Sequence, residues 1–151
     1  MTVIVQNLQT KVPVTDKLTR AARRAAEATL SSQGVGQRVE LSITFVDDTV
    51  MRELNRRYRG ENEPTDVLSF SMNEEMLEDG GKVLLLGDVI ISLETAARWA
   101  ESAGRDLTAE LVQLTAHGTL HLLGFDHQNE KEAARMSVVE QKIVKSLGRP
   151  E

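Results

Sequence analysis

KVLLLGDVIIS, residues 82–92, is the stretch of sequence that decides the fold. It is rich in Val, Leu and Ile, residue types that favour strands. Its apolar part is interrupted by Gly87 and Asp88 and is much shorter than the roughly 20 residues that a membrane-spanning helix needs. We therefore predict a strand at this position, and we expect no membrane segment in the chain.

Three further strands are indicated on either side of this one. Residues 39–46, VELSITFV, alternate apolar and polar side chains, as a strand does when one face is buried. Residues 2–5 alternate in the same way and suggest a first or edge strand. TDVLSFSM, residues 65–72, predicts a strand that precedes an acidic stretch, residues 73–81, which we expect to be a loop.

Apolar spacing and capping residues predict the helices. Residues 14–34 carry apolar or small side chains at helical intervals, with Thr15 or Asp16 as the N-cap and Gly34 closing the helix. Four more helices are expected: from Asp47 and Asp48 through Asn55, from Ser92 to about Ala103, from Thr108 into a histidine-rich segment, and from about Glu130 to Ser146.

The order of these elements is strand, helix, strand, helix, two strands and three helices. This order predicts an α+β fold, or layered α/β fold, with a small mixed four-stranded sheet and about five or six helices. The chain has 151 residues, which fits one domain over residues 1–151.

The composition limits the classes of function. The absence of cysteine excludes disulfides and thiolate metal sites and fits a cytoplasmic protein, and no signal peptide is expected at the N-terminus. The net charge of −5 disfavours non-specific binding to nucleic acid. However, RELNRRYR, residues 52–59, concentrates arginines that can bind phosphate locally. Most such charged runs are simply solvated helix faces, and composition alone favours that interpretation.

All three histidines of the chain lie in HGTLHLLGFDH, residues 117–127. On a helix, His117 and His121 share one face because they are four residues apart, which suits two ligands of one metal ion. Gly124 can end the helix and let the chain turn back, so that His127 supplies a third ligand. Three protein ligands leave a tetrahedral ion one open position, as in catalytic zinc sites.

This spacing is also the frame that metzincin proteases use, but one residue differs. Those enzymes carry a glutamate directly after the first histidine as general base, and here that position is Gly118. A protease is therefore not the first choice. A phosphodiester substrate would need a protein base less, because zinc lowers the pKa of bound water to about 7. Asp126 either orients a ligand or caps and solvates the loop, and the sequence leaves both alternatives open.

Three blocks of the chain resemble the YbeY family of bacterial endoribonucleases, the rRNA maturation factors. They are HGTLHLLGFDH, LNRRYRGENEPTDVLSFSM and LLLGDVIIS, which occur in the family's order within residues 40–147. The resemblance implies a zincin-like layout with the metal-binding helix in the C-terminal half. It also implies that His117, His121 and His127 bind one zinc ion and that Arg59 acts in catalysis.

The activity implied by the resemblance is cleavage of single-stranded RNA. The family's assigned work is maturation of the 3′ end of 16S rRNA and ribosome quality control, with the ribosome or ribosomal proteins as expected partners. Two alternatives stay open: a metallohydrolase acting on a peptide or amide, and a non-catalytic ribosome-assembly factor that contains zinc. Histidine ligands also suit other metals, and the sequence does not give the oligomeric state.

Overall fold

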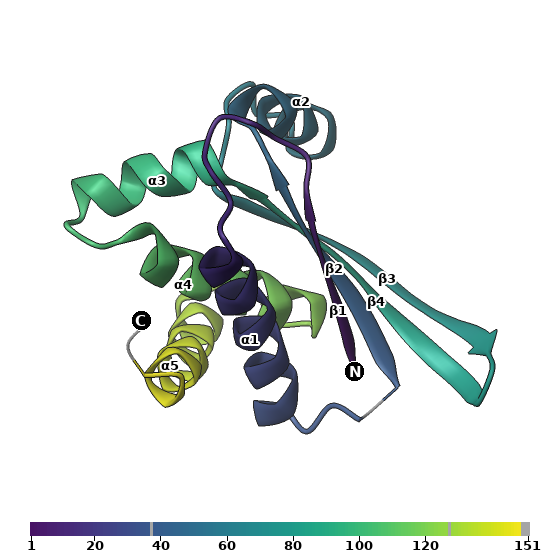
Figure 1. The fold of residues 1–151 in the computed structure, drawn as a ribbon. Helices are drawn as coiled ribbons and strands as arrows, with labels where there is room; N and C mark the ends of the chain where they lie inside the picture. The colour runs from purple at the N-terminus through teal and green to yellow at the C-terminus, as the bar shows by residue number, and fades with distance from the viewer. Residues whose placement is uncertain (37, 127, 149–151) are drawn as a thin grey trace.

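The structure of the protein is a computed structural model that describes residues 1–36, 38–126 and 128–148 (Figure 1). The described part contains four strands and five helices. They are β1 (Thr2–Asn7), α1 (Asp16–Ser32), β2 (Val39–Val46), α2 (Asp48–Arg59), β3 (Val67–Glu78), β4 (Gly81–Ser92), α3 (Leu93–Ser102), α4 (Leu107–Leu122) and α5 (Glu130–Ser146).

The four strands form one mixed sheet in the order β1-β2-β4-β3. β1 and β4 run parallel to β2 on either side of it, whereas β3 pairs antiparallel with β4 and forms one edge. The predicted α+β class and mixed four-stranded sheet are confirmed. The five helices also agree with the prediction.

Helices cover the two faces of the sheet unequally. Ile43, Val89 and Ile91 point to the face on which α1 and α4 pack, and there they form the main core. Leu68 and Ile90 point to the other face, where they pack against residues of α2. In Figure 1, α2 accordingly lies on the opposite side of the strands from α1, α4 and α5.

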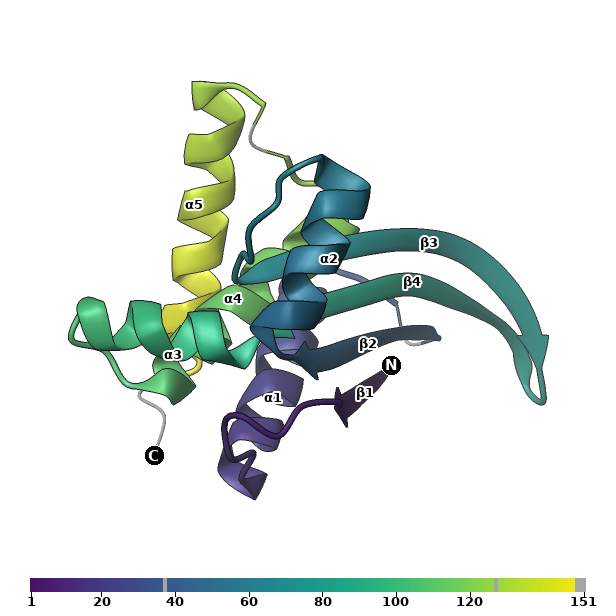
Figure 2. The same cartoon turned by 90° about the horizontal axis from the view of Figure 1, so that it is seen from above.

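The acidic segment of residues 73–81 is not a loop, so that expectation was wrong. β3 continues to Glu78 and stays paired with β4, with Glu74 opposite Leu85 and Glu78 opposite Gly81. The resulting hairpin reaches beyond the other strands (Figure 2). Its side chains from residue 71 to residue 78 are exposed, so this part is held chiefly by backbone pairing with β4 and no buried apolar pattern marks it.

Two helix boundaries also differ from the prediction. α2 continues past Asn55 to Arg59 and ends where Gly60 adopts a left-handed conformation with φ 73°. Asn55 is fully buried instead, and its side-chain amide donates to the Glu63 carbonyl at 2.8 Å. The N-cap of α4 is Asp106, two residues before the predicted Thr108, and its side chain accepts from the Ala109 N–H at 2.7 Å. Over the described ranges, no helix is long and apolar enough to cross a membrane.

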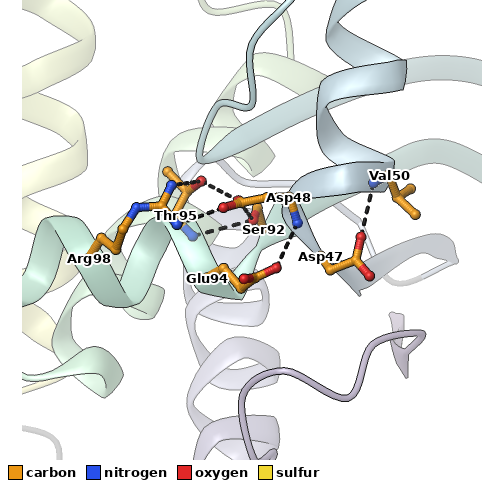
Figure 3. A network of polar contacts seen from close by, with 7 residues as sticks. All are labelled: Asp47, Asp48, Val50, Ser92, Glu94, Thr95 and Arg98. Carbon is orange, nitrogen blue, oxygen red and sulfur yellow. Dashed lines mark hydrogen bonds and ion pairs between the residues drawn. The ribbon is translucent and has the colours of Figure 1, made fainter.

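A polar network joins the starts of α2 and α3 (Figure 3). One carboxylate oxygen of Asp48 accepts hydrogen bonds from the Ser92 and Thr95 hydroxyls, each at 2.6 Å. The other accepts from Arg98, also at 2.6 Å. Burial raises the pKa of the Asp48 carboxyl, but the hydrogen bonds from Ser92, Thr95 and Arg98 outweigh it, so the pKa lies below the usual 3.8. The network fixes the helix that ends at Arg59.

We expect Asp48→Asn to lower the free energy of unfolding by about 1–3 kcal/mol at neutral pH, because Ser92, Thr95 and Arg98 lose a charged acceptor and the amide offers one oxygen in place of two. Because the pKa of Asp48 is lower in the folded state than in the unfolded state, its carboxylate stabilises the fold fully above the unfolded-state pKa. This stabilisation is lost as the pH falls through the folded-state pKa. The difference between wild type and variant should therefore be constant above about pH 4 and shrink below it. Urea unfolding at several pH values above and below about 4 measures this difference in the free energy of unfolding. Asp79→Asn in the exposed hairpin turn is the control. A difference that stays the same at low pH would contradict this assignment.

Candidate functional site

α4 brings two of the predicted metal ligands together. The His117 and His121 rings have centroids 4.7 Å apart and an interplanar angle of 74°, and their Nε2 atoms are 3.2 Å apart. Two Zn–N bonds of 2.0–2.1 Å at a tetrahedral angle would separate the two nitrogens by about 3.3 Å. The spacing of the two imidazoles therefore fits two ligands of one zinc ion. The third predicted ligand, His127, lies outside the described residues.

A carboxylate from α5 contacts the first of these histidines. Oε1 of Glu140 lies 3.1 Å from Nδ1 of His117, on the side of the ring opposite the nitrogen that faces His121. Glu140 is buried, with 8% of its surface exposed. The sequence analysis missed this residue. A signal was available, since Glu140 occupies a core-facing position between Met136 and Ile143 at helical spacing.

His117 and His121 line one wall of a cleft of about 450 Å³, and Arg59 lines the same cleft. Arg59 comes from the last turn of α2 and the histidines from α4, so the cleft joins residues nearly sixty positions apart in sequence, beside the edge strand β3. The Arg59 side chain is 49% exposed and its nearest carboxylate, Glu61, is 4.0 Å away. Such an exposed pair contributes little and leaves the guanidinium available to a substrate.

The neighbouring arginines are engaged elsewhere. Arg56 forms a two-point ion pair with Glu53, with distances of 2.6 and 3.1 Å, and Arg57 lies 3.5 Å from the same carboxylate. The hydrogen bond from Arg56 lowers the pKa of Glu53, and the same contact raises the pKa of Arg56. Within the described ranges, Arg59 is the arginine that lines the cleft.

The rest of the cleft is mostly polar. Thr65, Asp66, Ser69 and Ser71 contribute side chains, and Val67 is the apolar member of the same segment. One Asp66 oxygen accepts from the Val67 N–H at 2.8 Å and from the Thr65 hydroxyl at 3.3 Å. Hydroxyl groups and a guanidinium are suited to a phosphate or ribose ligand. Sequence reasoning did not select these four residues, because isolated Ser, Thr and Asp side chains in and before a strand carry no distinctive spacing.

Asp126 lies in a different hollow of about 210 Å³, which is lined by Leu123, Gly124, Phe125, Asp126, Glu132 and Arg135. Arg135 stands over the Phe125 ring there, 5.3 Å from its centroid. Asp126 is not among the residues that line the cleft of Arg59 and the histidines.

Gly118 is the point at which α4 touches the sheet. A Cβ at this residue would lie 2.6 Å from Cγ1 of Val89 and 3.2 Å from both the Ser69 hydroxyl and a Val67 methyl. The Ser69 hydroxyl also donates to the Gly118 carbonyl at 2.8 Å. The position where a metzincin carries its glutamate is therefore packed directly against β3 and β4, and no side chain fits there.

We expect Gly118→Ala to lower the free energy of unfolding by about 1–3 kcal/mol, because the added methyl overpacks the helix–sheet contact. In an open helix, the same substitution would instead stabilise by roughly 0.5–1 kcal/mol. Urea unfolding measures the effect. Gly36→Ala is the control, because a Cβ there meets nothing within 4 Å. The cost should be smaller in a Val89→Ala background, where the clashing methyl is absent. A Gly118→Ala protein as stable as wild type would contradict the assignment.

Comparison with known proteins gives the family of the chain and agrees with its fold. The family model described as Endoribonuclease YbeY matches residues 4–148. A protein of Pelotomaculum thermopropionicum named Endoribonuclease YbeY is 48% identical over 148 residues, covering 97% of each chain. A protein of Desulforamulus reducens with the same name is 43% identical over 150 residues, covering 98% of each.

A solved structure also resembles the chain. The solution structure of TM1509 from Thermotoga maritima superposes with a TM-score of 0.64 at 23% sequence identity, covering 96% of this chain and 88% of that one. At this identity the likeness shows the fold alone. The sequence relatives carry the family assignment, and it confirms the resemblance on which the sequence analysis relied. By the match along almost its whole length, this chain belongs to the endoribonuclease YbeY family.

Proposed function

We propose that this protein is a zinc-dependent endoribonuclease that cleaves single-stranded RNA during rRNA maturation in the cytoplasm. Membership of an endoribonuclease family gives the enzyme class. The observation that carries the proposal is the shared cleft, in which the guanidinium of Arg59 and the imidazoles of His117 and His121 meet. We assign maturation of the 3′ end of 16S rRNA as the task, together with ribosome quality control.

In this proposal His117, His121 and His127 hold the ion. The donor set fits, because the two described imidazoles present nitrogens 3.2 Å apart and one of them is backed by a carboxylate at its other nitrogen. A bound zinc would supply a Lewis acid and lower the pKa of a bound water to about 7. Gly118 leaves no room beside His117 for the glutamate base of a peptidase, which disfavours a peptide or amide substrate.

The chain's own contribution to cleavage is then chiefly electrostatic. Arg59 is placed to bind the non-bridging oxygens of the scissile phosphate through its planar fork of N–H donors. Negative charge on those oxygens increases toward the transition state, so a fixed guanidinium stabilises the transition state more than the ground state. The hydroxyl of Ser71 lines the same cleft and can donate to the sugar–phosphate backbone, and the oxygens of Thr65 and Ser69 can accept from a ribose hydroxyl.

Selection of the RNA needs a further source of specificity. The chain has one Trp, one Tyr and three Phe, few for a protein that recognises bases by stacking. A binding partner therefore supplies part of the specificity in this proposal, and the ribosome or a ribosomal protein is the partner that we infer.

The proposal is tested with purified protein and an end-labelled RNA presented as a single strand and as a duplex. We expect cleavage of the single strand only, loss of cleavage on chelation, and recovery when zinc is restored. A terminal 2′,3′-cyclic phosphate would indicate attack by the neighbouring 2′-hydroxyl, and its absence would indicate attack by water. Protein that binds zinc but cleaves no RNA, even with ribosomal subunits present, would overturn the proposal in favour of an assembly factor.

A further inference from the structure

Glu140 is a buried acid on α5 whose carboxylate contacts the imidazole of His117. Its carboxylate lies 3.1 Å from Nδ1 of His117, and the contact joins α5 to α4. An apolar cluster lies at the same helix pair. The cluster at this helix pair consists of Ala116, Leu120, Met136 and Ile143, with Ala28, Phe125 and Val139 packed against it.

Stability does not account for a carboxylate at this position. Moving a carboxylate out of water costs several kcal/mol, and a hydrogen bond with an imidazole repays only part of that cost. Apolar residues of similar volume commonly serve as well or better at such positions. Leucine at position 140 would extend the stripe of Met136 and Ile143 without that cost. The presence of Glu140 at this position therefore indicates a role for its charge and its acceptor oxygens.

The contact determines which nitrogen of His117 carries the proton. A carboxylate oxygen can only accept, so Nδ1 of His117 must be the donor. In a neutral imidazole the lone pair is then at Nε2, and Nε2 is the atom that faces His121 at 3.2 Å. The same hydrogen bond also fixes the rotation of the ring about its χ2 angle. Both effects prepare Nε2 to bind a metal ion.

We infer that Glu140 is the positioning residue of the metal site: it holds His117 in the Nδ1–H tautomer and orients its Nε2 toward the ion. This inference rests on the proposed function for the identity of the metal site. Carboxylates behind metal-binding histidines raise the basicity of the ligand, and their removal typically weakens metal affinity by 10–100-fold.

Zinc affinity provides the first test, measured by competition with a chromogenic chelator. We expect Glu140→Gln and Glu140→Leu to weaken zinc binding by about 10–100-fold. Glu101→Gln, which removes the same charge from an exposed position on α3, should bind zinc as wild type does. Urea unfolding should show Glu140→Leu to be at least as stable as wild type without metal, which separates the loss of affinity from a loss of fold. Unchanged affinity in both Glu140 variants would overturn the inference.

The tautomer provides a second test that needs no metal. Long-range ¹H–¹⁵N spectra at pH about 8.5, well above the ordinary histidine pKa of about 6.5, report which ring nitrogen is protonated. We expect His117 of the metal-free wild type to show a protonated Nδ1, and the Glu140→Leu variant to show a mixture of tautomers. The same tautomer in both proteins would overturn the inference. Wild-type protein that binds no zinc would instead overturn the proposed metal site, and the spectra would still decide whether Glu140 sets the tautomer.

Discussion

Replacing Arg59 with glutamate is expected to reduce kcat/KM for single-stranded RNA by about 10³-fold while the protein keeps its zinc. Loss of one fixed donor at a developing negative charge costs about 10²–10³ in rate, and charge reversal adds repulsion of the phosphate. Most of the loss should fall on kcat, because the charge that Arg59 stabilises develops in the transition state. Single-turnover cleavage with saturating enzyme measures that component directly.

The control for Arg59→Glu is Arg20→Glu, which makes the same charge change at an exposed position on α1. Its zinc content and rate should match those of wild type. The Arg59→Glu protein should also unfold like wild type, because the Arg59 side chain is half exposed and its ion pair with Glu61 is long, at 4.0 Å. Equal cleavage by wild type and Arg59→Glu would mean that Arg59 is not catalytic or that the activity comes from a contaminant.

His121→Ala is expected to lose both the metal and the activity. The variant removes one of two nitrogens that lie 3.2 Å apart, and the remaining ligands cannot enclose a tetrahedral ion. Bound zinc should fall from one per chain in the wild type to close to zero, and cleavage should fall below detection. Elemental analysis of dialysed protein gives the first quantity, and the RNA assay gives the second.

Gln113→Ala is the matched control for this helix, because Gln113 lies on α4 two turns before His121 and is not among the residues of the cleft. It should retain both zinc and cleavage. Arg59→Glu and His121→Ala together separate metal binding from catalysis, since Arg59→Glu should be inactive with metal and His121→Ala inactive without it. Zinc content that is unchanged in His121→Ala would contradict the metal site itself.

The fold was largely predictable because its helices and inner strands bury apolar faces. The final helix is confirmed at both ends, Glu130 and Ser146, and Thr15 and Ser92 are confirmed as caps of α1 and α3. The outer half of β3, residues 73–78, was not predictable from side-chain patterns. Its exposed residues pair with β4 through backbone hydrogen bonds, and such pairing leaves no periodic signature in the sequence.

The candidate site was predictable only where its residues are adjacent in sequence. His117 and His121 follow from the four-residue helical interval, and the structure places their nitrogens together. The proximity of Arg59 to them depends on how α2 ends beside β3, which no local pattern encodes, and the family resemblance alone singled it out. Glu140 was missed for a related reason, since its partner is 23 residues away on another helix. The assignment of His127 as the third ligand stays a prediction.

Gly118 also bears on how enzymes of this shape can change over evolutionary time. Judged by the sequence pattern alone, one substitution at this residue would give the helix the glutamate of a peptidase. In this molecule that side chain would have to pass through the methyl group of Val89, 2.6 Å from its first carbon. The helix would first have to move away from the sheet, and the spacing of its histidines from Arg59 would change with it. Two kinds of hydrolase that look one mutation apart are therefore separated by a shift of the backbone.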